Sequence, residues 1–278
     1  MPAPYSHAEL EWQMPECRRW YESLAAHRNL IRYDNRGYGL SDRDADDYSL
    51  EAHIADLAAV VDRLGLGEFV LFGAIQHGLV AIAYAARYPE RVSHLILWCS
   101  LIRGSDSSAS SQLTAARPLI SENWGLYTQA TAHIFFGLPT REASRRFATM
   151  MQHSVTPETH QKARAKMTQF DVEEMLPLIR SPVLVLHRRD APYPSLDVAR
   201  ELTARIPDSR LVLLDGDVMP PYVGEVAPVL DAIAGAPVSP PCSKPTCATR
   251  ALMASSCLRT STGLRVLSFG SSSRSTRP

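Results

Sequence analysis

The chain has 278 residues, 45% of them apolar and 21% charged, and a formal net charge of zero; this is enough apolar sequence to bury a core in one domain or two small ones. No apolar run approaches the roughly 18 residues of a membrane span, and residues 1–7 lack an apolar segment of signal-peptide type, so we expect a cytoplasmic protein. The five cysteines show neither a metal-ligand spacing nor a disulfide framework, which argues against a secreted scaffold.

Strand and helix patterns alternate along the body of the chain. Apolar runs predict strands over residues 30–33, 68–72, 92–98, 183–186 and 210–214. Amphipathic or small-residue patterns predict helices over residues 50–64, from the turn after 72 to 88, 196–206 and 223–234. Strands regularly separated by helices imply a mostly parallel, doubly wound sheet covered on both faces, which is an α/β fold.

Two other stretches differ from this alternation. Between residues 113 and 176 the strand patterns disappear, and aromatic residues such as Trp124 and Phe136 accompany helical spacing, so we predict an all-helical cap. From about Val238 the chain is rich in Ser, Thr, Pro, Cys and Arg without a sustained apolar period, which predicts a disordered basic tail. We therefore predict a core formed by residues 1–112 and 177–237, a cap of residues 113–176, and a tail of residues 238–278.

The segment Gly73-Ala74-Ile75-Gln76-His77-Gly78 joins the second predicted strand to its helix. A strand, a glycine-flanked turn and a helix are the setting in which one hydrolase fold presents a nucleophilic serine as Gly-x-Ser-x-Gly. Here Ile75 stands in the place of that serine.

Several motifs occur together in the chain. They are Arg32-Tyr33-Asp34-x-Arg36-Gly37-x-Gly39-Leu40-Ser41-Asp42, the turn above, Ala83 to Leu97, Ser6-His7-x-Glu9-x-Glu11-Trp12, Trp124-Gly125, Asp171-Val172 and Leu186-His187-Arg188-Arg189-Asp190. With these motifs the chain resembles the α/β-hydrolase fold superfamily over about residues 4 to 234. More narrowly, it is similar to the hydrolase-like domains that bacteria fuse to adenylate cyclases or to LuxR-type DNA-binding domains.

The resemblance implies a triad of serine, acid and histidine in that chain order. The serine position falls on Ile75, whose side chain has no nucleophilic atom, and the histidine position falls on Met219. Only the acid, at or near Asp190, is present. Because loss of the nucleophile or the base alone costs about 10⁶ in turnover in serine hydrolases, we predict a catalytically inactive protein. The site positions that remain are Ile75, Gln76, His77 and Met219 around a pocket.

The turn is also expected to have changed shape. A nucleophile turn of this kind holds its central residue in a strained conformation that costs on the order of 1 to 3 kcal/mol, which a β-branched residue tolerates poorly. We therefore expect a relaxed turn at Ile75. His77 replaces a residue that is usually small, and its ring should loosen the turn further.

Other residues offer an alternative chemistry. His77 could act as a base, and Cys99 or Ser100, at the end of the strand of residues 92–98, could lie near the same pocket. The plainer interpretation is that His77 is a partly exposed residue of the first helical turn, Cys99 a small buried apolar residue and Ser100 a loop residue.

The two ends of the chain differ from the family pattern. In that family the sheet begins with strands that precede residues 6–12, and one of them lies between the strands of residues 30–33 and 68–72. We therefore expect an interior gap with unpaired backbone groups, and interpret it as a start assigned too late or as a gene remnant. The tail from Ser239 has the composition that reading a GC-rich coding region in the wrong frame could produce.

Three functional hypotheses follow. The chain is a non-catalytic hydrolase-fold domain descended from a ligand-sensing lobe of a bacterial signalling protein, an esterase-like hydrolase of small acyl substrates with non-standard residues, or a decayed fragment. We expect no cofactor, no metal and no membrane partner, and a tail without aromatic interleaving does not indicate nucleic-acid binding. The aromatic and aliphatic residues of the cap suggest a small, largely apolar ligand.

Overall fold

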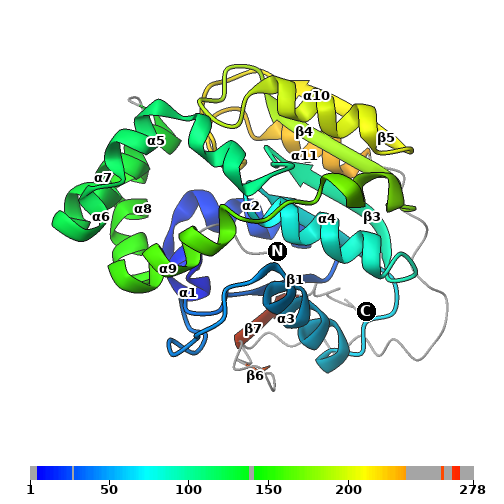
Figure 1. Cartoon of the computed structure of the whole chain (residues 1–278). Helices are drawn as coiled ribbons and strands as arrows, with labels where there is room; N and C mark the ends of the chain where they lie inside the picture. The colour runs from blue at the N-terminus through cyan, green and yellow to red at the C-terminus, as the bar shows by residue number, and fades with distance from the viewer. Residues whose placement is uncertain (1–4, 27, 138–140, 236–257, 260–264, 270–278) are drawn as a thin grey trace, which may run out of the picture.

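The computed structural model describes residues 5–26, 28–137, 141–235, 258–259 and 265–269. Its main sheet has four parallel strands in the order β2-β3-β4-β5 (Figure 1). These strands are β2 Phe69–Ala74, β3 Val92–Trp98, β4 Val183–Arg188 and β5 Ser209–Leu214. The predicted α/β fold with a mostly parallel sheet is confirmed.

Burial explains why these segments form strands. Every residue of β4 is buried, and β3 is buried at all positions but one, as expected for strands covered by helices on both faces. Figure 1 shows α4 on one face of the sheet and α11 on the other. The helices outside the cap are α1 Ala8–Gln13, α2 Pro15–Ala25, α3 Leu50–Arg63, α4 His77–Arg87, α10 Leu196–Arg205 and α11 Ala227–Ala234. Among the described residues, no helix is both long and apolar enough to span a membrane.

A second sheet lies beside the first, in the order β1-β7-β6, with β1 Leu30–Tyr33, β6 Leu258–Arg259 and β7 Arg265–Phe269. β1 does not join the main sheet, and within the described part of the chain no strand pairs with the outer edge of β2. The expected gap is therefore present. Helix α2 contacts both sides of it, since Trp20 packs against Phe72 of β2 at 6.5 Å between ring centroids and Tyr21 packs under Arg32 of β1 at 3.5 Å.

The tail departs from the prediction of disorder in two places. β6 pairs with β7, and β7 pairs antiparallel with β1 from Leu30↔Phe269 to Tyr33↔Val266. The apolar residues of the segment Arg265–Phe269 were too few to give a period on their own, and the free edge of β1 supplies the backbone partners that the local sequence does not reveal. The other residues predicted to be disordered lie outside the described residues.

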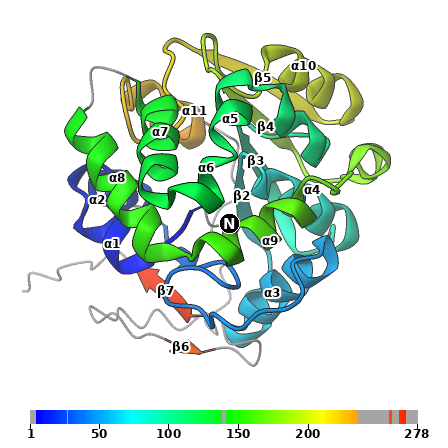
Figure 2. The same ribbon diagram turned by 60° about the vertical axis from the view of Figure 1, so that its left-hand side comes forward.

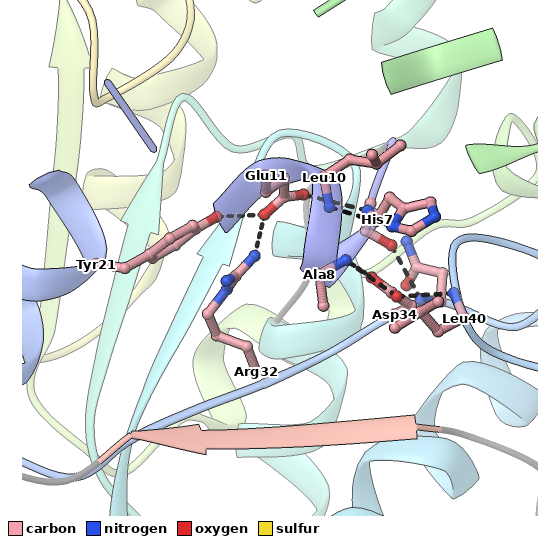
Figure 3. Close-up of polar contacts among 10 residues, drawn as sticks. His7, Ala8, Leu10, Glu11, Tyr21, Arg32, Asp34 and Leu40 are labelled. Carbon is pink, nitrogen blue, oxygen red and sulfur yellow. Dashed lines mark hydrogen bonds and ion pairs between the residues drawn. The ribbon is translucent and has the colours of Figure 1, made fainter. Parts of the chain in front are cut away.

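The N-terminal segment is tied to β1 by buried carboxylates (Figure 3). Glu11 accepts hydrogen bonds from the Tyr21 hydroxyl, at 2.5 Å, and from the Arg32 guanidinium. Asp34 accepts from the amide of Ala8 at 3.0 and 3.1 Å and from that of Leu40 at 2.9 Å. Burial outweighs these bonds and raises the pKa of Asp34 to about 6. The start of α1 is thus fixed beside the end of β1.

The helices between β3 and β4 form the cap. They are α5 Ser111–Ala116, α6 Leu119–Glu122, α7 Trp124–Phe136, α8 Arg141–Ser154 and α9 Pro157–Met167, flanked by the 3₁₀ helices η1 Gly104–Ala109 and η3 Glu173–Leu178. Figure 2 shows α5 to α9 grouped in front of β2 and β3. Backbone bonds join cap and core, from the amide of Gly39 to Ser154 O at 2.8 Å and from that of Met219 to Phe135 O at 2.8 Å.

Candidate functional site

The turn between β2 and α4 keeps a left-handed residue at its centre. Ile75 has φ +53° and is 6% exposed. Its amide donates to Trp98 O at 2.9 Å, and its carbonyl accepts from the amide of Gly78 at 3.0 Å. The prediction of a relaxed turn is therefore wrong. A tertiary hydrogen bond to Trp98, a local one within the turn and burial of the side chain hold Ile75, and together they outweigh the preference of a β-branched residue for φ below zero.

The turn is also closely packed on both sides. A Cβ on Gly73 would lie 2.6 Å from Cβ of Ala81, and one on Gly78 would lie 1.9 Å from Oγ of Ser100. The loosening expected from His77 is absent. These two glycines let strand, helix and neighbouring loop approach within distances that no side chain at either position would permit.

His77 is buried rather than partly exposed, with 1% of its surface accessible. Its ring meets that of His53 edge to face, with centroids 5.8 Å apart. Both ring nitrogens of His77 and Nε2 of His53 are buried without a hydrogen-bond partner among the described residues. Burial lowers the pKa of His53 to about 4 and that of His77 below its ordinary value. The prediction failed because the sequence around His77 does not show that α3 covers this turn.

The other triad positions do not come together as an acid–base pair. Met219 is fully buried, its amide donates to Phe135 O, and its carbonyl accepts from Nε1 of Trp98 at 2.8 Å. Asp190 is exposed, and its amide donates to Gly216 O at 3.2 Å. Within the described part of the chain its carboxylate has no hydrogen bond or ion pair. Asp190 therefore holds the acid position in sequence without a histidine to orient.

A buried arginine fills space beside these positions. Arg188, the end of β4, is 1% exposed, donates to Val223 O, and lies over the ring of Trp98 at 5.6 Å. A Cβ on Gly224 would meet its Nη1 at 2.8 Å. The guanidinium thus lies against the same loop that carries Met219. Arg188 belongs to the motif of residues 186–190, whose sequence gives no sign that this arginine is buried.

The alternative nucleophiles are buried as well. Cys99 has φ +42° and no accessible surface, and burial raises the pKa of its thiol to about 12. The cysteine is therefore a neutral thiol at physiological pH, not a thiolate. Ser100 is 1% exposed, and its hydroxyl donates to Leu101 O at 3.3 Å. Neither side chain forms a hydrogen bond with His77, because both ring nitrogens of His77 lack a partner among the described residues.

A cavity of about 60 Å³ lies between the turn and the cap. Gln76 lines it from the turn, and Tyr5, Tyr38, Tyr127 and His160 line it from four other segments. The hydroxyl of Tyr38 lies 3.1 Å from Nδ1 of His160, and those of Tyr5 and Tyr127 lie 3.2 and 3.1 Å from its Nε2 and 3.0 Å from each other. Burial, followed by the charge of Arg164, lowers the pKa of His160 to about 3. The imidazole is therefore neutral at physiological pH.

Sequence reasoning missed this cluster. Its four residues come from the N-terminal segment, the loop after β1, α7 and α9, and no spacing in the sequence connects them. Its only sequence signal was the presence of aromatic residues in the cap, which we interpreted as apolar lining. Among the described residues, no group of three or more His, Cys, Asp and Glu side chains is placed to hold a metal ion.

Comparisons with known proteins agree with this architecture. The alpha/beta hydrolase fold family matches residues 11–217. A RutD protein of Pseudomonas savastanoi pv. phaseolicola, assigned as a carbamate hydrolase, is 27% identical over 225 residues, which cover 78% of this chain and 85% of that protein. The AB hydrolase superfamily protein YisY of Bacillus subtilis is 26% identical over 232 residues, covering 75% and 79% of the two chains.

Two solved structures show the same fold. MGS-M2, an alpha/beta hydrolase enzyme from a Medee basin deep-sea metagenome library, has a TM-score of 0.70 at 15% identity and covers 87% of this chain and 90% of its own. An esterase of Exiguobacterium antarcticum has a TM-score of 0.65 at 20% identity, covering 72% and 78%. The turn, the parallel sheet, the cap and the match over most of the chain lead to one conclusion: the protein belongs to the alpha/beta hydrolase fold family.

Proposed function

We propose that this protein binds a small molecule in the cavity between core and cap and does not hydrolyse it through the turn at Ile75. One observation carries the proposal. The turn keeps the left-handed centre that would present a nucleophile, yet the side chain it holds there is an aliphatic group that is 6% exposed. An isoleucine side chain can pack against a ligand but has no atom that forms an acyl intermediate.

The surroundings of Met219 support the same proposal. A base at this position would need a titratable side chain within hydrogen-bond reach of the nucleophile. Met219 supplies none, and Asp190, which would orient that base, is exposed to solvent. The similarity to hydrolase-like domains fused to adenylate cyclases and LuxR-type regulators supports a ligand-sensing role in the bacterial cytoplasm, and this origin is part of the proposal.

A second candidate function is hydrolysis of small acyl substrates by non-standard residues. The observation that favours it is the set of relatives, which includes the RutD protein assigned as a carbamate hydrolase. It would need Cys99, Ser100 or His77 as nucleophile or base. The burial of all three side chains and the high pKa of the Cys99 thiol argue against this chemistry.

A panel of p-nitrophenyl acyl esters and carbamates separates the two functions. We expect release of p-nitrophenol at the rate of the buffer, and the same rate for Cys99→Ala, Ser100→Ala and His77→Phe. A matched control is Ser121→Ala, which changes an exposed serine of the cap. Turnover by the wild type that disappears in Cys99→Ala, Ser100→Ala or His77→Phe, while circular dichroism shows that the variant is folded, would establish the hydrolase instead.

A further inference from the structure

The cavity beside Gln76 has polar atoms that the protein itself leaves unpaired. Oε1 of Gln76 and Nε of Arg164 belong to residues that line it, and each is buried without a hydrogen-bond partner among the described residues. An unpaired buried polar group costs about 1 to 3 kcal/mol. Such groups around one cavity take their partners from its contents, which are either water or a bound molecule.

The tyrosine cluster adds one donor to this set. A neutral imidazole has one N–H and one accepting nitrogen. If Nε2 of His160 carries the hydrogen, Tyr38 donates to Nδ1, and only one of Tyr5 and Tyr127 can donate to the other. If Nδ1 carries it, the imidazole donates to Tyr38, whose own hydrogen has no acceptor in the cluster. In either tautomer one hydroxyl hydrogen has no acceptor within the cluster itself.

Two arginines give the cavity its charge. Arg117 and Arg164 both line it, and each lies close enough for its charge to act on Tyr127. Arg117 donates to Ser107 O at 3.4 Å and to Oγ of Ser108 at 3.2 Å. In the described part of the chain neither arginine forms an ion pair. Two cations that face one cavity without a carboxylate repel each other, and an anion between them removes that repulsion.

We propose that the cavity binds a small carboxylate whose charge is shared by Arg117 and Arg164, with a hydroxyl or amide N–H on the same molecule donating to Oε1 of Gln76. This inference rests on the proposed function and names its ligand class. The cavity has room for only a few water-sized groups, which limits the ligand to the size of a hydroxy acid such as glycolate or lactate. The lining therefore favours a small anion over the apolar molecule that the cap composition suggested.

Lactate and lactamide test the inference, because they share a shape and differ in charge. We expect lactate, titrated at constant ionic strength, to shift the backbone amide NMR signals of Gln76, Tyr127 and Arg164 with a saturable curve, and lactamide to bind at least about 10-fold more weakly. Arg164→Gln and Arg117→Gln should each weaken lactate binding by about 10- to 100-fold. Lys162→Gln, which removes an exposed charge from the same helix α9, is the matched control and should leave it unchanged.

The outcomes separate this inference from the proposed function. If glycolate and lactate cause no saturable shifts, or if Arg164→Gln and Lys162→Gln weaken binding equally, the carboxylate assignment is wrong. If lactamide binds saturably and as tightly as lactate, the carboxylate assignment is wrong, but the proposed function of non-catalytic ligand binding still stands. Turnover in the ester panel would overturn the proposed function, whatever the result with lactate. Amide spectra of both arginine variants show whether they are folded.

Discussion

The rings of His53 and His77 meet edge to face inside the protein, with 5.8 Å between their centroids, and three of their four nitrogens have no hydrogen-bond partner among the described residues. Burial is the main cause of the low pKa of both histidines, and it lowers that of His53 to about 4. The unfolded chain, in which a histidine has a pKa of about 6.5, takes up protons first as the pH falls. The stability contributed by a neutral His53 is therefore complete above about pH 6.5 and is lost as the pH falls toward about 4.

We predict that His53→Leu reduces the pH dependence of the free energy of unfolding. Between pH 7 and pH 4.5 the wild type should lose up to about 3 kcal/mol more than the variant, since one pKa unit corresponds to about 1.4 kcal/mol. Urea unfolding at both pH values measures this difference. His153→Leu changes an exposed histidine and serves as control. Equal pH dependence in wild type and His53→Leu would contradict the prediction.

Asp34 changes the free energy of unfolding in the opposite direction over the same pH range. Its folded-state pKa of about 6 is raised by burial, so its contribution to stability is present below about pH 4 and is lost as the pH rises through 6. The pH dependence of the wild-type free energy of unfolding therefore contains the contributions of both His53 and Asp34. The comparison of His53→Leu with wild type isolates the histidine, because Asp34 is the same in both proteins.

The close approach of Gly78 to Ser100 gives a second prediction. Gly78→Ala places a Cβ 1.9 Å from Oγ of Ser100 and should lower the free energy of unfolding by about 1 to 3 kcal/mol through overpacking. Ser100→Gly removes the clashing atoms, so the double variant Gly78→Ala/Ser100→Gly should recover a large part of that loss. Gly67→Ala, with no atom within 4 Å of the added Cβ, is the neutral control. If the two single substitutions change the free energy of unfolding additively in chemical denaturation, Gly78 and Ser100 are not coupled.

The sequence predicted the elements with strong local patterns. The run of residues 92–98 became β3 with the same bounds, and residues 183–186 became the first part of β4. These segments are almost wholly buried, so their apolar composition is dictated by their environment. The gap between β1 and β2 was also predictable, because the resemblance to the α/β-hydrolase fold places another strand between the segments of residues 30–33 and 68–72.

The site was less predictable because its properties arise from tertiary contacts. Whether Ile75 relaxes depends on its hydrogen bond to Trp98, and whether His77 is exposed depends on the helix that carries His53. The cluster around His160 combines segments more than a hundred residues apart. Propensity and periodicity describe a residue's neighbours along the chain and carry no information on such pairings.

The strain at Ile75 gives a third prediction. Ile75→Leu replaces a side chain that is branched at Cβ, at φ +53°, by one of equal volume that is branched at Cγ instead. The same exchange at Ile96, which lies in β3 and is 2% exposed, changes packing without relieving a left-handed backbone. We expect Ile75→Leu to be less destabilising than Ile96→Leu by about 1 kcal/mol in urea unfolding. If Ile75→Leu lowers the free energy of unfolding by as much as Ile96→Leu does, or by more, the turn does not store the expected strain.

A serine introduced at position 75 should not by itself give esterase activity. Ile75→Ser returns a hydroxyl to the centre of the turn, but Met219 supplies no base and Asp190 is exposed. Because loss of the base alone costs about 10⁶ in serine hydrolases, the variant should release p-nitrophenol from p-nitrophenyl acetate no faster than wild type. Ile75→Ser/Met219→His should also lack a burst, since the main chain of Met219 is fixed by Phe135 and Trp98 and Asp190, at the acid position, is exposed to solvent. A burst stoichiometric with folded enzyme in the single variant would show that another residue acts as base, and that the turn retains the rest of a working site.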